Sequence, residues 1–139
     1  MNDSVLDNHR DLWEDDSHFD QSVTCSLTLQ TAIAFHNLGV GYLCQSKANP
    51  RRVAHFRKMA IRFFKLSYAL LVKQYQSTTS DNHAWKELGM PQLFVVVLTT
   101  LIRTLRDAQE HETANQLCPT LQNLRQVMAD DTVHVIGVN

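Results

Sequence analysis

The feature that most constrains the fold is a glycine set among large apolar residues at helical spacing, in the segment Phe-His-Asn-Leu-Gly-Val-Gly-Tyr at residues 35–42. Leu38 and Tyr42 lie four residues apart, so they share one face of a helix. Gly39 lies beside them and has no side chain, so a second helix can approach the backbone closely there. The segment therefore predicts a helix that packs tightly against a neighbouring helix.

A second pattern, Ala60-x3-Phe64-x2-Ser67, predicts that neighbour. Ala60 and Ser67 are small and allow the same close approach from the other side, whereas Phe64 fills the space between them. Together the two patterns predict an antiparallel helical hairpin, with helices expected over residues 26–45 and 51–75.

The two patterns, in this order, resemble the tetratricopeptide repeat, a helix–turn–helix unit. The turn is longer than in that family, so we expect extra residues around 46–57 to lengthen the turn and the second helix. A degenerate second copy follows, with helices expected over 91–106 and 112–128. None of its motif positions holds an aromatic residue, and Thr99 replaces the glycine. The matching positions of this copy are Val95, Leu98, Thr99, Ile102, Ala114, Cys118 and Leu121.

The resemblance implies an all-α fold of antiparallel helical hairpins, a fragment of a TPR-like α-solenoid, that binds proteins and is not an enzyme. It also implies a groove on the inner face of the first and third helices that receives an extended peptide or a partner helix. Val40 stands where some members grip acidic tails with an Asn, so we expect an apolar or helical ligand. Alternatively, the N-terminal arm or another subunit covers this face. The groove residues are Ile33, His36, Val40, Leu43, Val96, Thr100 and Arg103.

The chain divides into an acidic N-terminal arm at residues 1–22, a helical domain at 23–130 and a C-terminal tail at 131–139. The arm is polar, and we expect it to be disordered or docked. The tail is expected to be extended. Two repeats bury little apolar surface, so we expect the domain to be stabilised by the arm, by self-association or by a permanent partner.

The formal net charge of −1 conceals a strong asymmetry, because residues 1–20 carry −6 and the rest of the chain carries +5. No acidic residue lies between Asp20 and Asp81. On an ideal helix, the basic residues of the second helix fall within a narrow arc opposite its apolar face. This basic stripe consists of Arg51, His55, Lys58, Arg62, Lys65 and Lys73.

The basic stripe has two interpretations. It is either a solvated outer face or a surface that binds an anionic partner, because a solvated helix face usually mixes both signs of charge. The candidate partners are an acidic protein, the chain's own N-terminal arm and nucleic acid. Nucleic acid ranks last, because the chain is net acidic and no aromatic residues interleave with the cations on the basic face of the helix. We further predict that the arm pairs with the stripe, in the same molecule or in a neighbour.

Catalytic and metal-binding motifs are not recognisable. The seven histidines are widely separated, no metal-ligand spacing occurs, and no nucleophile elbow or phosphate loop is present. We therefore predict no metal, no cofactor and no enzymatic activity. No apolar run is long enough to span a bilayer. Three cysteines at unrelated spacings, Cys25, Cys44 and Cys118, indicate a reducing compartment. The expected location is intracellular, cytoplasmic by default, with an organelle as the alternative.

The sequence thus predicts a non-catalytic protein–protein interaction module, a TPR-like adaptor that binds a partner peptide or helix, with a protein partner or a homo-oligomer as its complex. One alternative is a structural accessory subunit of a larger assembly. Another is a small helical enzyme or regulator with an unrecognised site. A measurement of size in solution separates the first two, because an autonomous monomer favours an adaptor.

Overall fold

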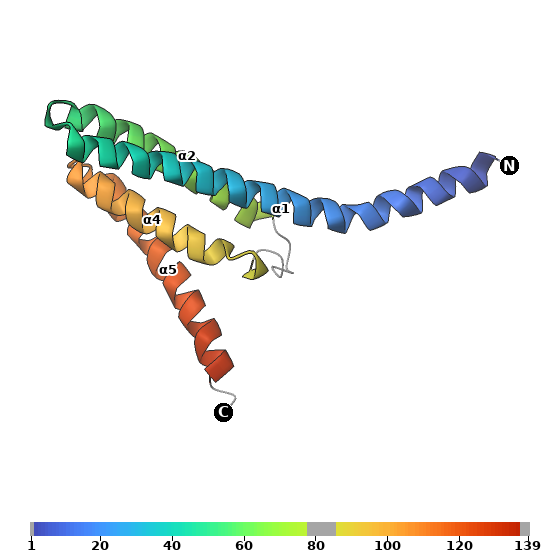
Figure 1. Cartoon of the computed structure of the whole chain (residues 1–139). Helices are drawn as coiled ribbons and strands as arrows, with labels where there is room; N and C mark the ends of the chain where they lie inside the picture. Colours follow the sequence, from blue (N-terminus) through green and yellow to red (C-terminus); the bar gives the residue numbers. More distant parts are fainter. Residues whose placement is uncertain (1, 78–85, 137–139) are drawn as a thin grey trace.

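The computed structural model describes the backbone of residues 2–77 and 86–136, and the side chains of residues 23–77 and 86–130. In this part of the chain the fold is all-α, as predicted, and four helices pack against one another (Figure 1). The elements are α1 (Asn2–Ala48), the short 3-10 helix η1 (Pro50–Arg52), α2 (Val53–Ser77), α4 (Met90–Asp107) and α5 (His111–Ile136).

The helices α1 and α2 form the predicted antiparallel hairpin around Gly39. A Cβ atom built on Gly39 would lie 2.7 Å from Cδ1 and 2.9 Å from Cζ of Phe64, well inside normal contact distance. Phe64, Ala60 and Ser67 are fully buried, and the Ser67 hydroxyl donates a 2.8 Å hydrogen bond to the Ala32 carbonyl oxygen. The absence of a side chain at Gly39 is therefore what allows the two helices to approach this closely.

The predicted place of Leu38 in this contact is wrong, because its side chain is 50% exposed. Tyr42, four residues later, does contact α2, where its ring stacks on Phe63 at a centroid distance of 5.5 Å and lies 6.3 Å from Phe56. Phe35 continues the row, 6.1 Å from Phe63. The contact surface between α1 and α2, which we call the seam, is therefore centred between Gly39 and the aromatic residues, and Leu38 lies outside it.

The ends of both outer helices differ from the sequence expectation. The helix α1 begins at Asn2 rather than near Ser26, because residues 2–38 contain no Gly or Pro that would stop it. In Figure 1 this N-terminal part of α1 runs beyond the other helices. Similarly, α5 continues to Ile136, where an extended tail was expected. The docking of side chains within residues 1–22 lies outside the side chains described.

The inner boundaries agree more closely with expectation. Pro50 begins η1, and Pro91 lies in the first turn of α4, where a missing backbone N–H is tolerated. Gly89, directly before α4, adopts a left-handed φ of 75°, a conformation that favours glycine. The helix α2 continues to Ser77, and residues 78–85 lie outside the described part of the chain.

The second hairpin, α4 with α5, packs on α2 and touches α1 at few points. The helix α4 is the most buried element. The ring of its Phe94 meets the ring of Tyr68 on α2 edge-on, at a centroid distance of 5.6 Å. Ala114 of α5 is fully buried, as predicted, and Cys118 is half-buried. None of the described helices is both long enough and apolar enough to cross a bilayer.

Gly41 contrasts with Gly39, because a Cβ atom built on Gly41 meets nothing within 4 Å. A glycine inside a helix costs about 0.5–1 kcal/mol relative to alanine, since it loses more backbone entropy on folding. We therefore expect Gly41→Ala to raise the free energy of unfolding by about that amount, measured by chemical denaturation. A loss of stability would show instead that the outer side of α1 is in contact at Gly41.

Candidate interaction surfaces

The residues predicted to line the peptide groove lie on two helices that scarcely touch, α1 and α4. Ile33 and Val40 are each 39% exposed, and Val96 is 50% exposed. Arg103 is also exposed, whereas His36, Leu43 and Thr100 are half-buried. None of the seven lines either of the two cavities described below. The peptide groove therefore stays a prediction.

His36 lies inside the first hairpin rather than open to a ligand. Its ring centroid is 5.2 Å from that of Phe64, and its buried Nδ1 atom has no hydrogen-bond partner among the described residues. Burial lowers the pKa of His36 below its usual value, because a charged imidazolium would lose hydration there. His36 is thus neutral in the folded protein near pH 7.

A pH dependence of stability follows from His36. The pKa of His36 is lower in the folded than in the unfolded state. Its contribution to the free energy of unfolding is therefore fully present above the unfolded pKa of about 6.5, and it is lost as the pH falls toward the folded pKa. Between pH 7.5 and 5 the wild-type chain should therefore lose more unfolding free energy than His36→Gln does. If the unfolding free energies of the two proteins changed with pH in parallel, His36 would have the same pKa in the folded and unfolded states.

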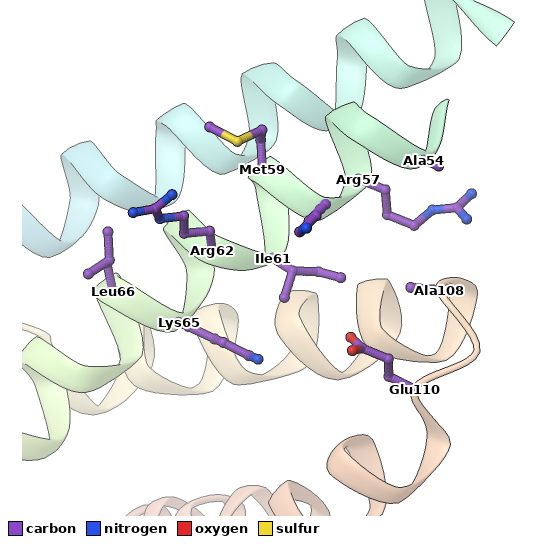
Figure 2. A pocket seen from close by; sticks show the side chains of 10 residues that line it. Ala54, Arg57, Met59, Ile61, Arg62, Lys65, Leu66, Ala108 and Glu110 are labelled. Carbon is purple, nitrogen blue, oxygen red and sulfur yellow. The ribbon is translucent and has the colours of Figure 1, made fainter. Parts of the chain in front are cut away.

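The basic stripe is exposed along its whole length on η1 and α2. Part of it borders a cavity of about 680 Å³ between α2 and the turn that joins α4 to α5 (Figure 2). We call this cavity the basic cleft. Its lining residues are Ala54, Arg57, Lys58, Met59, Ile61, Arg62, Lys65, Leu66, Ala108 and Glu110.

The basic cleft combines an apolar lining with cations at its edges. Ile61 is 7% exposed and extends from α2 toward the turn that carries Ala108 (Figure 2). Leu66, at the other end, is 41% exposed. Glu110 is the single carboxylate among the lining residues, against four cationic side chains. The cleft can therefore contact the apolar part of a ligand and, at the same time, its negative charges.

Three of the four cations of the basic cleft are free to meet a ligand. Arg57 is already held, because its Nη1 donates a 3.1 Å hydrogen bond to the Asp107 carbonyl oxygen at the end of α4. Lys58, Arg62 and Lys65 are exposed and form no ion pair with any described side chain. Within the described part of the chain, Glu110 is thus the one carboxylate that lines the cleft, and it forms no ion pair with these three cations.

Sequence reasoning found the cations of the basic cleft but not the cleft itself. Lys58, Arg62 and Lys65 were predicted as one face of α2 from their spacing. Ala108 and Glu110 carried no signal, because they reach α2 only through the packing of the second hairpin on the first. The predicted stripe residues Arg51 and Lys73 lie outside the cavity lining.

A second cavity, of about 630 Å³, lies between α2, α4 and α5. Its lining includes the rings of Tyr68, Tyr75 and Phe94, and Lys86 is its one charged side chain. The cavity offers an apolar and aromatic surface without a pattern of charge, so its lining does not define a ligand class.

The described side chains gather no group of three potential metal ligands, and the buried cysteine is not activated. Cys25 is buried, and burial raises the pKa of its thiol, although the 2.8 Å hydrogen bond from Gln74 Nε2 acts in the opposite direction. The Cys25 thiol is therefore protonated near neutral pH and is not a nucleophile. Within residues 23–77 and 86–130, no three potential metal ligands lie together.

Of the two described cavities, the basic cleft is thus the one that combines residues predicted from the sequence, an apolar lining and cations that indicate the charge of a ligand. Comparison of the chain with protein-family models, with curated proteins and with solved structures finds no match.

Proposed function

We propose that the chain is a non-catalytic protein–protein interaction module that binds an acidic segment of a partner protein, as a peptide or a helix, in the basic cleft. The observation that supports it is the set of Lys58, Arg62 and Lys65, exposed and without ion pairs among the described side chains, beside an apolar lining. The TPR-like arrangement of hairpins belongs to the same proposal.

Charge alone is too weak to hold such a ligand. An exposed ion pair contributes at most about 1 kcal/mol and weakens with salt, so three cations give about 3 kcal/mol at best. Burying one large apolar side chain against the Ile61 region adds about 1.5–3 kcal/mol. The ligand should therefore contain both acidic residues and an aromatic or aliphatic anchor.

The proposal is tested by affinity capture with the full chain as bait. The cleft variant Arg62→Glu/Lys65→Glu reverses two exposed charges at the cavity. The control variant Lys73→Glu/Arg125→Glu makes the same change in net charge at exposed positions outside both cavities. We expect proteins captured by the wild type to be retained by the control and lost, by about tenfold or more, with the cleft variant.

Two further readouts decide the result of the capture experiment. The binding segment of each captured protein, mapped with overlapping peptides, should be rich in Asp and Glu and should contain an apolar anchor. If the wild type and the cleft variant retain the same proteins, or if the mapped segments carry no excess of acidic residues, the cleft is not the binding site.

A second candidate function, a structural accessory subunit, is favoured by the outer side of α1. Residues 21–46 contain no Asp, Glu, Lys or Arg, and Val23, Leu27 and Leu38 are between 40% and 57% exposed. A helix that lacks charge on all sides is normally covered by another element. A permanent complex recovered at constant stoichiometry, insensitive to the cleft variant, would favour this candidate over the adaptor.

A further inference from the structure

The partner of the basic cleft can be identified from the charge of this chain itself. We propose that the cleft of one molecule binds the acidic N-terminal segment, residues 2–22, of a second copy. This inference rests on the proposed function of the same cleft, and it names the ligand.

The arm of the same molecule cannot reach its own cleft while α1 is continuous. The pairs Phe35–Phe63 and Tyr42–Phe56 show that α1 and α2 run antiparallel, so the cleft residues of α2 lie beside the C-terminal half of α1. From Asp20 to Gly39 the helix rises about 30 Å, at 1.5 Å per residue. Figure 1 shows the N-terminal part of α1 leading away from the α1–α2 turn. Docking within one molecule would require α1 to break.

A second copy supplies the matching charge and the anchor. Residues 1–20 carry −6, and the acidic residues recur at intervals of three and four, at positions 3, 7, 11 and 14. This interval is the repeat of an α-helix, the conformation of the segment here. The same segment contains Trp13 and Phe19 as apolar anchors. A cavity of about 680 Å³ is in the size range that encloses small ligands, so it can receive one aromatic side chain.

Two molecules can exchange their N-terminal segments reciprocally and so form a closed dimer. The acidic segment and the cleft lie toward opposite ends of α1, so two molecules related by a twofold axis can each place their arm on the other's cleft. In that arrangement the α1 helices run antiparallel beside each other. Their stretch from 21 to 46 has no charged residue, so no like charges oppose each other there. The predicted assembly is a reciprocal dimer.

The dimer is tested with full-length chains by sedimentation equilibrium at low and high salt. The wild type should be a dimer whose dissociation constant rises about tenfold or more when salt screens the charges. The cleft variant Arg62→Glu/Lys65→Glu and an arm variant, Asp3→Asn/Asp7→Asn/Asp11→Asn, should each dissociate at least about tenfold more easily. The control Lys73→Glu/Arg125→Glu should behave like the wild type. Circular dichroism checks that each variant is folded.

Mixing gives the decisive result. The cleft variant retains an intact arm, and the arm variant retains an intact cleft. A mixture of the two should form a 1:1 dimer through one intact contact, at a concentration at which each protein alone is mainly monomeric. A wild type that is monomeric at all concentrations, or a dimer that survives both sets of substitutions, overturns the inference. If cleft-dependent capture of other proteins persists in that case, the proposed function stands without it.

Discussion

Gly39→Leu is expected to lower the free energy of unfolding by about 1–3 kcal/mol or more, because the new side chain would enter space that the ring of Phe64 already fills. Phe64 is fully buried, so its ring cannot swing into solvent to make room. The two helices must instead separate, which also weakens the hydrogen bond from Ser67 to Ala32. Urea denaturation followed by circular dichroism measures the loss.

The matched control for this change is Gly41→Leu. It adds the same side chain to the same helix two residues away, where a Cβ atom meets open space. Its unfolding free energy should equal or exceed that of the wild type, because leucine is a better helix former than glycine. Equal stability of Gly39→Leu and the wild type would contradict the packing of α1 on α2.

Leu101→Ala is expected to cost about 2–5 kcal/mol, the second large effect. Leu101 is 1% exposed and belongs to the core cluster that joins α2, α4 and α5. Truncation removes buried methyl groups and leaves a cavity that neighbours such as Leu98 and Leu105, also buried, cannot fill without moving. Both hairpins should therefore lose stability together, in one cooperative transition.

Val96→Ala serves as the control for Leu101→Ala, because Val96 lies on the same helix and is 50% exposed. Its effect should stay within about 0.5 kcal/mol, as for other surface substitutions. If Leu101→Ala were as mild as Val96→Ala, the second hairpin would not share a core with the first.

The first hairpin could be predicted from sequence because its signal is local on each helix. A glycine at position 39 and small residues at positions 60 and 67 indicate close approach whatever the rest of the chain does. Leu38 was misplaced because spacing defines a shared face, but it does not say how far around the helix the partner extends. The ring of Tyr42 is large enough to contact α2, whereas the side chain of Leu38 lies outside the seam.

The length of α1 could not be predicted from charge and polarity. Residues 1–22 lack the apolar density of a core helix and were therefore assigned to a separate arm. Helix continuation depends instead on the absence of a breaker, and no Gly or Pro interrupts residues 2–38. The same reasoning applies to the C-terminal part of α5, because no Gly or Pro lies between Met128 and Ile136, where the helix ends.

The cations of the basic cleft could be predicted from the sequence, but the cavity beside them could not. The face formed by Lys58, Arg62 and Lys65 follows from helical spacing, and their lack of acidic neighbours follows from the sequence. The cavity itself depends on the angle between the two hairpins, which brings Ala108 and Glu110 opposite α2. That angle results from many small packing contacts far apart in the chain, so no short pattern specifies it.

Site-specific photo-crosslinking tests most directly whether the basic cleft receives acidic segments. A photoreactive amino acid is placed at Ala54, which lines the cleft, and separately at Gln122, an exposed residue of α5 outside both cavities. After irradiation in cells, mass spectrometry identifies the attached peptides. We expect adducts at position 54 to map to acidic segments with an apolar anchor, including residues 2–22 of a second copy. Equal adducts at both positions, or adducts at position 54 without an excess of acidic residues, would contradict the account.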